Sequence, residues 1–205
     1  MNRHWTIPRM WAGGTVAVLA SGPSMTPEVA QAVRAAGVYT IAVCNTWEMA
    51  PWADLAFAGD APWWHKYHAA TAGFAGLKAC LEETPFADVL LLRNGGKQGF
   101  DTDPSTLRTG GNSGYGAVHI AAHAGAARIL LCGFDMRGGH WHSPHQWPLY
   151  QGGEGHFPKW IARFATLAPE LAARGIEVLN CTPDSALDVF PMARLEDALQ
   201  ATEVA

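Results

Sequence analysis

The chain has 205 residues, of which 49% are apolar and 16% are charged, and its formal net charge is -4. This composition is typical of one globular domain with a substantial core, and it excludes a largely disordered chain. The net negative charge and the lack of Lys/Arg runs indicate no basic surface that would bind duplex nucleic acid or an anionic membrane. No apolar stretch reaches the roughly 18 residues of a membrane span.

The N-terminal half of the chain predicts short strands that alternate with helices. Short apolar runs followed by turn residues predict strands at residues 15–20, 39–44, 55–58 and 89–92. Thr26 is a good N-cap, Pro27 suits the first helical position and Gly37 a helix end, so a helix is expected between the first two strands. A second helix is expected over residues 62–78, and a polar, Gly-rich loop over residues 93–111.

The C-terminal half continues this alternation. Helices are expected at residues 113–124 and 157–174, strands at 128–132 and 176–179, and short helices at 184–187 and 195–201. Residues 136–156, rich in Gly, His, Trp and Pro, are expected to be a second long irregular segment. The pattern predicts an α/β fold with a Rossmann-like, doubly wound, mainly parallel sheet and helices on both faces. We expect one nucleotide-binding domain over residues 1–205, with a lid at about residues 136–158.

The four cysteines, Cys44, Cys80, Cys132 and Cys181, form no Cys-x-x-Cys pair. Three of them lie within or just after apolar, strand-like runs, which favours buried thiols in a reducing compartment over disulfides. We therefore expect a cytoplasmic protein.

Polar residues gather just after the predicted strands. These clusters are Ser21–Ser24, Asn45, Asp60, Asp135 and Asn180. In an open α/β sheet, ligands bind outside the carboxyl ends of the strands. We therefore expect all five clusters to face one crevice.

Two loops have the chemistry of an anion site. In Ser21-Gly22-Pro23-Ser24, the glycine permits a tight turn, and the hydroxyls and N–H groups before the next helix suit a phosphate. The alternative is an ordinary strand-to-helix turn. Residues 109–116 contain four glycines and open a helix, which would place N–H donors and the Ser113 hydroxyl at a positive helix end. The alternative there is a flexible loop with a helix cap.

Histidines are concentrated in the predicted lid. Three lie within residues 140–145, among them His142, and His156 follows. A lid that carries one general base fits the usual role of His near neutral pH, with a metal site or plain packing as alternatives. His119 and His123 share a face of an Ala-rich helix, and we interpret them as packing or surface residues.

Several motifs, in this order along the chain, resemble the bacterial sialyltransferases of glycosyltransferase family 42. The pattern strand–Ser-Gly-Pro-Ser–helix–strand–Cys-Asn at residues 15–45 is similar to the start of that family, where an Asn-Gly-Pro-Ser loop and a Cys-Asn contact a cytidine nucleotide sugar. Residues 112–115 and 124–135, which end in Gly-Phe-Asp, are similar to its Ser-Gly–helix–strand–Gly-x-Asp segment. Residues 181–187 resemble its Cys-Pro-Asn-Ser segment.

This resemblance implies a nucleotide-sugar-dependent glycosyltransferase with a CMP- or UDP-linked donor. The acceptor stays open between a glycan and a modified nucleic-acid base. The resemblance implies that His156, or else His142, deprotonates the acceptor hydroxyl. Asp60 stands where the family has a donor-binding Asn and is the third candidate for a catalytic role. Contacts with the donor are implied for Ser21, Gly22, Pro23, Ser24, Asn45, Asn112, Ser113, Gly114, Asp135, Tyr150, Thr182 and Ser185.

The chain also departs from that family. Ser21 replaces the first Asn of the family loop, and a carboxylate at Asp60 would repel an anionic sugar such as sialic acid. Asp60 and Asp135 would instead suit Mg²⁺-assisted phosphate chemistry. The same Gly-Pro-Ser loop, Gly-rich helix start and Gly-x-Asp strand end also resemble the MptE-like proteins, which include archaeal 6-hydroxymethylpterin diphosphokinases.

The alternatives are therefore an MptE-like, Mg²⁺-dependent pyrophosphokinase or nucleotidyl transferase, and a non-catalytic nucleotide-binding protein. Compact proteins similar to this chain occur in phage genomes. The nine tryptophans fit either an acceptor platform or the interface of a homo-oligomer.

Overall fold

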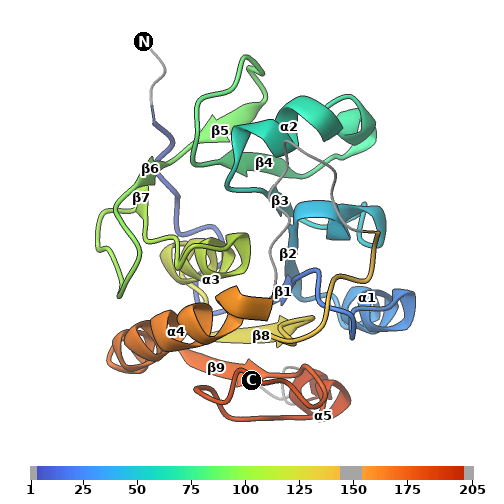
Figure 1. Cartoon of the computed structure of the whole chain (residues 1–205), viewed down its shortest axis with the longest axis vertical. Coiled ribbons are helices and arrows are strands. Elements are labelled where there is room, and N and C mark those ends of the chain that lie inside the picture. The colour runs from blue at the N-terminus through green and yellow to red at the C-terminus, as the bar shows by residue number, and fades with distance from the viewer. Residues whose placement is uncertain (1–3, 144–153, 201–205) are drawn as a thin grey trace.

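The computed structural model describes residues 4–143 and 154–200 and contains one seven-stranded sheet in which neighbouring strands are parallel (Figure 1). The strand order is β5-β4-β3-β2-β1-β8-β9, so β1 is an interior strand and the strand order reverses between β1 and β8. This arrangement confirms the predicted Rossmann-like α/β fold. The strands are β1 (Thr15–Leu19), β2 (Tyr39–Val43), β3 (Leu55–Phe57), β4 (Leu77–Cys80), β5 (Val89–Leu91), β8 (Arg128–Cys132) and β9 (Glu177–Asn180).

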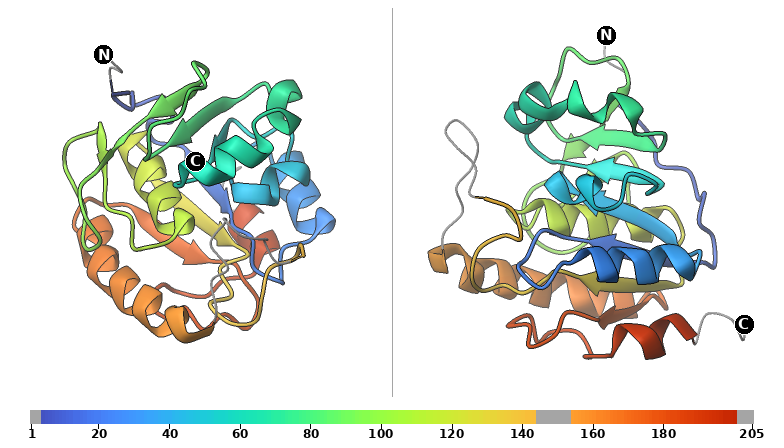
Figure 2. Two further views of the ribbon diagram at one scale, coloured as in Figure 1. Left: turned by 45° about the horizontal axis from the view of Figure 1, so that its top comes forward. Right: turned by 90° about the vertical axis from the view of Figure 1, so that its right-hand side faces the viewer.

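Helices cover both faces of the sheet (Figure 2). Side chains of β1 alternate between two cores, as the pleat of a strand requires: Val16 and Val18 pack in one core, and Ala17 and Leu19 in the other. The first core is covered by α3 (Ser113–His123) and α4 (Phe157–Ala172), and the second by α1 (Pro27–Ala35), α2 (Ala61–Tyr67) and α5 (Leu195–Gln200).

The helices α1 and α3 begin at side-chain caps, and the cap of α1 is the one that the sequence predicts. The Thr26 hydroxyl accepts a hydrogen bond from the N–H of Val29, and Pro27 is the first residue of α1. The side chain of Asn112 caps α3. Within α3, a Cβ atom at Gly116 would lie 2.8 Å from the Phe57 ring. The glycine therefore lets α3 lie close to β3.

The predicted helix over residues 62–78 is wrong beyond Tyr67. A 3-10 turn, η2 (Ala70–Gly73), follows α2, and the chain then enters β4. Lys78 interrupts the apolar pattern of this strand, yet it is buried, because its ammonium pairs with Asp88 at 2.8 Å. A buried lysine whose ammonium has an ion-pair partner hides a strand from any reading of apolar periodicity.

Smaller differences lie in the connecting segments. The predicted loop at 93–111 contains a parallel pair of two-residue strands, β6 (Arg93–Asn94) and β7 (Thr106–Leu107). Two further 3-10 turns are η1 (Cys44–Glu48) and η3 (Glu154–His156). The predicted short helix at 184–187 is wrong: the segment is a turn in which Asp184 has a left-handed φ of 51°.

The cysteines are free thiols, as predicted. Cys80, Cys132 and Cys181 are buried, and Cys44 is half-buried. Burial raises the pKa of Cys80 and of Cys44 to about 12, so both thiols are protonated at neutral pH. In the described ranges 4–143 and 154–200, none of the helices has the length and apolar character to cross a bilayer.

Candidate functional site

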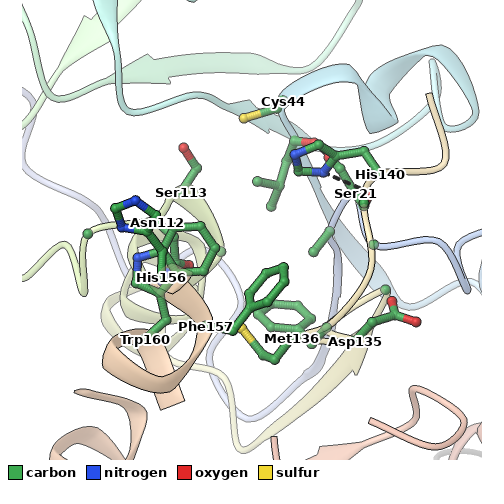
Figure 3. A pocket seen from close by; sticks show the side chains of 18 of the residues that line it. Ser21, Cys44, Asn112, Ser113, Asp135, Met136, His140, His156, Phe157 and Trp160 are labelled. Carbon is green, nitrogen blue, oxygen red and sulfur yellow. Dashed lines mark hydrogen bonds between the residues drawn. The ribbon is translucent and has the colours of Figure 1, made fainter. Parts of the chain in front are cut away.

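A pocket of about 890 Å³ opens at the carboxyl edge of the sheet, where the strand order reverses between β1 and β8. Its walls come from the loops after β1 and β8, the start of α3 and the start of α4 (Figure 3). Ligands of open α/β sheets bind at such crevices, in pockets of about 300–1,000 Å³. This pocket, named the switch pocket below, is therefore the candidate site.

The loop after β1 is held by hydrogen bonds to the loop after β8. The N–H of Gly22 donates to the carbonyl of Gly133 (2.9 Å), and the N–H and hydroxyl of Ser24 donate to the carboxylate of Asp135 (3.2 and 2.8 Å). Any side chain at position 22 would collide with Asp135 and Gly133, which explains the glycine. The donors that the sequence offers to a phosphate are thus already engaged within the protein.

Ser21 is also engaged. Its buried hydroxyl donates to the carbonyl of Val43 (3.2 Å) and lies 3.2 Å from the hydroxyl of Thr46. The backbone N–H of Trp141 donates to the carbonyl of Ser21 (3.1 Å), and the indole N–H of Trp141 donates to Thr46 (3.3 Å). These contacts fasten the start of the predicted lid segment to the ends of β1 and β2.

The start of α3 is the donor-rich wall of the switch pocket. The Asn112 side-chain oxygen accepts from the N–H of Tyr115 (2.9 Å). The main-chain N–H groups of Ser113 and Gly114, the first two helical residues, find no partner within the described part of the chain. The Ser113 hydroxyl accepts from the N–H of Gly59 at 3.1 Å. Free N–H groups at a helix N-terminus favour an anion.

Besides Arg137 in the loop after β8, three cationic side chains line the pocket and are named the cationic wall below: Lys97, Lys159 and Arg163. Arg163 donates to the carbonyl of Gly110 (2.7 Å), which places its guanidinium beside the start of α3. Lys97 and Lys159 are exposed. Together with the helix end, these groups make this side suitable for a phosphate.

An apolar surface lies beside this cationic wall. It includes the rings of Phe157 and Trp160 (Figure 3). Flat aromatic side chains suit the face of a nucleobase or of a sugar ring. Two residues of the pocket, Cys44 (φ 49°) and Met136 (φ 52°), have left-handed backbone conformations, and such strain is concentrated at functional sites.

Two carboxylates, Asp60 and Glu82, form a third part of the wall. Asp60 occupies the N-cap position of α2 but makes no capping bond. Glu82 accepts from the N–H of Ala61 (2.8 Å) in its place. Partial desolvation, followed by the nearby charge of Glu82, raises the pKa of Asp60. No group of three or more His, Cys, Asp or Glu side chains with the placement of a metal site occurs in the described residues.

His142 and His156, the two candidate bases, both line the switch pocket, as does His140. The imidazole of His140 is stacked on that of His142 (ring centroids 4.9 Å apart) and its Nδ1 lies 3.2 Å from the carbonyl of Ser21. The ring of His156 lies 6.0 Å from that of Trp160. The Tyr150 prediction and part of the lid lie outside the described residues.

The switch pocket brings together most of the predicted site residues but not all of them. Thr182 and Ser185 lie behind the pocket and fix the main chain of Phe134: the Thr182 hydroxyl accepts from its N–H (2.9 Å) and the Ser185 hydroxyl donates to its carbonyl (2.6 Å). Asn45 and Asn180 are buried in internal hydrogen bonds rather than facing the crevice. Pro23 and Ser24 do not line the pocket. The predicted residues that do are Ser21, Gly22, Asp60, Asn112, Ser113, Gly114, Asp135, His142 and His156.

Sequence reasoning missed the cationic wall and Glu82. Lys159 and Arg163 are four residues apart, so they share one face of α4 near its start, and this spacing is visible in the sequence. Lys97 gives no such signal, because it reaches the pocket from an irregular loop. Glu82 follows β4, a strand that the sequence did not predict.

The chain was compared with known protein families, with curated proteins and with solved structures, and it matched none of them. The function is therefore argued from the chemistry of the switch pocket.

Proposed function

We propose that this protein is a nucleotide-sugar-dependent glycosyltransferase. The observation that carries the proposal is the division of the switch pocket into a cationic, N–H-rich wall at α3 and α4 and an aromatic wall beside it. A nucleotide sugar has a matching division into a diphosphate or phosphate and a flat nucleobase. The volume of about 890 Å³ accommodates a ligand of that size.

The reaction transfers a glycosyl group to an acceptor hydroxyl. A bond forms between the acceptor oxygen and the anomeric carbon, and the bond from that carbon to the nucleotide phosphate breaks. The bonding electrons leave with the phosphate, whose developing charge the N–H groups of Ser113 and Gly114 and the cations Lys97, Lys159 and Arg163 stabilise. His156 takes the proton of the acceptor hydroxyl, and His142 is the second candidate for that base.

The acceptor in this proposal carries a free hydroxyl, on a glycan or on a modified nucleic-acid base. We also propose that the protein works in the cytoplasm, where nucleotide sugars are made and where its four thiols stay reduced.

Thermal-shift titrations with CMP, UDP, GDP and ATP and their sugar conjugates, each with and without Mg²⁺, test the proposal. A ligand at 100 times its dissociation constant stabilises the fold by roughly 2.7 kcal/mol. We expect a metal-independent response to a nucleotide sugar, and hydrolysis or transfer of its sugar that His156→Ala reduces at least a hundredfold. Binding without any turnover would instead identify a non-catalytic nucleotide-binding protein.

A second candidate is Mg²⁺-dependent pyrophosphoryl or nucleotidyl transfer. The observation that favours it is the pair of carboxylates, Asp60 and Glu82, on the wall next to the anion-binding side, since Mg²⁺ is held by one or two carboxylates plus substrate phosphates. Asp135, the other carboxylate in the predicted Mg²⁺ site, is instead bonded to Ser24. A response to ATP that requires Mg²⁺ and is lost in Asp60→Asn would favour this second function.

A further inference from the structure

Lys97 reaches the switch pocket from the segment between β6 and β7, whereas Lys159 and Arg163 belong to α4. The side chain of Lys97 makes no hydrogen bond or ion pair within residues 4–143 and 154–200. The position of its ammonium group is therefore set by its main chain. On an unrestrained loop this charge would be spread over a large volume, and ordering it around a phosphate would cost binding free energy.

Lys97 lies in a turn between two glycines. Gly96 (φ 110°) and Gly99 (φ 71°) both have backbone conformations that favour glycine. The N–H of Gly96 donates to the side-chain oxygen of Asn94 (3.0 Å), and the carbonyl of Gly96 accepts from the N–H of Thr109 (2.8 Å). The second of these bonds fastens one side of the turn to the loop that precedes α3.

The other side of the turn is fastened by two side chains from the helices. The N–H of Gly99 donates to the hydroxyl of Thr166 on α4 (2.8 Å), and the carbonyl of Gly99 accepts from the phenol of Tyr115 on α3 (2.9 Å). The Thr166 hydroxyl donates in turn to the carbonyl of Arg163 (2.7 Å). This hydroxyl thus connects the turn that carries Lys97 to the helix that carries Arg163. Tyr115 and Thr166 lie outside the set of residues that line the switch pocket.

Both of these side chains are themselves held in place. Tyr115 is fully buried, and its ring packs against that of Phe164 with the centroids 4.9 Å apart. Thr166 is half-buried, and its hydroxyl is bonded to its own helix. Both main-chain polar groups of Gly99 are therefore bonded to fixed partners, and Gly99 is only two residues from Lys97.

We propose that Tyr115 and Thr166 are positioning residues for phosphate binding and that they act through Lys97. Their bonds to Gly99 hold the turn in the conformation that presents the Lys97 ammonium to the pocket, so less conformational entropy is lost when an anion binds. The inference rests on the proposed function, because it concerns the cationic wall. It extends the site to two side chains that do not contact the ligand.

Double-mutant cycles with inorganic pyrophosphate, measured by calorimetric titration at low salt, test this inference. Lys97→Ala should weaken binding about three- to tenfold. Thr166→Val, which removes the hydroxyl but keeps the shape of the side chain, should weaken it about two- to fivefold. In a Lys97→Ala background, Thr166→Val should change the affinity by less than about 1.5-fold, because the turn no longer carries the charge. In a Lys159→Ala background, Thr166→Val should keep its full effect.

Three further variants separate positioning from a general effect on the fold. Thr166→Ser retains the hydroxyl and should restore the affinity of the parent. Tyr115→Phe, which removes the other bond to Gly99, should weaken pyrophosphate binding with the same dependence on Lys97. Thr102→Val changes an exposed threonine outside the pocket and should leave the affinity unchanged. Urea unfolding confirms that each variant is folded under the conditions of the titration.

Equal effects of Thr166→Val with and without the Lys97 side chain would overturn the inference, because the hydroxyl would then act by a route other than Lys97. Unchanged affinity in both Thr166→Val and Tyr115→Phe would also overturn it. A parent protein that does not bind pyrophosphate would refute both the cationic wall and this inference. If the cycles behave as expected but no nucleotide sugar binds, the proposed function fails and the positioning role stands.

Discussion

Gly22 lies where the loops after β1 and β8 meet, and its hydrogen atom faces Asp135 and the carbonyl of Gly133. Gly22→Ala should lower the free energy of unfolding by about 1–3 kcal/mol, because the added methyl group separates these loops. Urea unfolding measures the change. The matched control is Gly73→Ala, where a Cβ atom meets nothing within 4 Å, and we expect it to stay within about 0.5 kcal/mol of the parent. Similar losses in both variants would refute this account.

His119 confirms the interpretation of the helix histidines as packing residues. It is fully buried, and its Nε2 accepts from the N–H of Asp101 (3.0 Å), while Nδ1 contacts the main chain of Arg108. The imidazole therefore pins the loop that leads into α3. Burial lowers the pKa of His119 to about 3.

This depressed pKa makes stability depend on pH. Between about pH 6.5 and pH 3 the unfolded chain binds a proton at position 119 that the folded chain does not bind, so His119 opposes folding increasingly as the pH falls. Relative to His119→Gln, the parent should lose up to about 1.4 kcal/mol of unfolding free energy per pH unit in this window. Urea unfolding from pH 7 to pH 4 tests this. The control Gln98→Asn, at an exposed position without a titratable side chain, should keep the parental slope.

Among the elements, β4 shows how a charge can conceal a strand. Lys78 is buried and pairs with Asp88, whose side chain is 52% exposed. The hydrogen bond from Lys78 lowers the pKa of Asp88 to about 2. Asp88→Asn should destabilise the fold by roughly 1–2 kcal/mol, because a buried ammonium is left uncompensated while the exposure of Asp88 screens part of the loss. Asp184→Asn is the control, and chemical denaturation is the measurement.

The start of α4 contributes positive charges to the lining of the switch pocket. Lys159→Ala should weaken the binding of inorganic pyrophosphate about three- to tenfold at low salt, and the difference should shrink as ionic strength rises, because the exposed ammonium is screened. Calorimetric titration measures both. Lys66→Ala removes an exposed lysine of α2 outside the pocket and should leave the affinity unchanged. If both variants weakened pyrophosphate binding equally, the cationic wall would not be part of the binding site.

The elements also show what a sequence can predict. Strands β1, β2 and β8 are short apolar runs bounded by turns, and their signals are local, so the fold class and the edge that carries the site follow from them. Which hydrogen-bonding groups are already used within the fold does not follow from these local signals. Ser24 and Asp135 are 111 residues apart, and only folding reveals that each satisfies the other. The replacement of Asp60 by Glu82 as a cap is hidden for the same reason.

At the scale of the whole molecule, β1 is enclosed by β2 and β8 and by helices on both faces. Val16 through Leu19 are fully buried. Amide hydrogens of β1 should therefore exchange only through global unfolding, whereas those of the edge strand β5, whose Leu90 and Leu91 are partly exposed, should exchange by local opening. Hydrogen exchange followed by NMR tests this order. Faster exchange in β1 than in β5 would contradict it.

The interior position of β1 also matters during synthesis on the ribosome. β2, the partner of β1 on one side, follows it directly along the chain, but β8, its partner on the other side, comes only at residues 128–132. A nascent chain that ends before β8 presents the apolar edge of β1 without a neighbour. Such an edge is a template for pairing between chains, so truncated products should aggregate and nascent chains should be substrates for ribosome-associated chaperones.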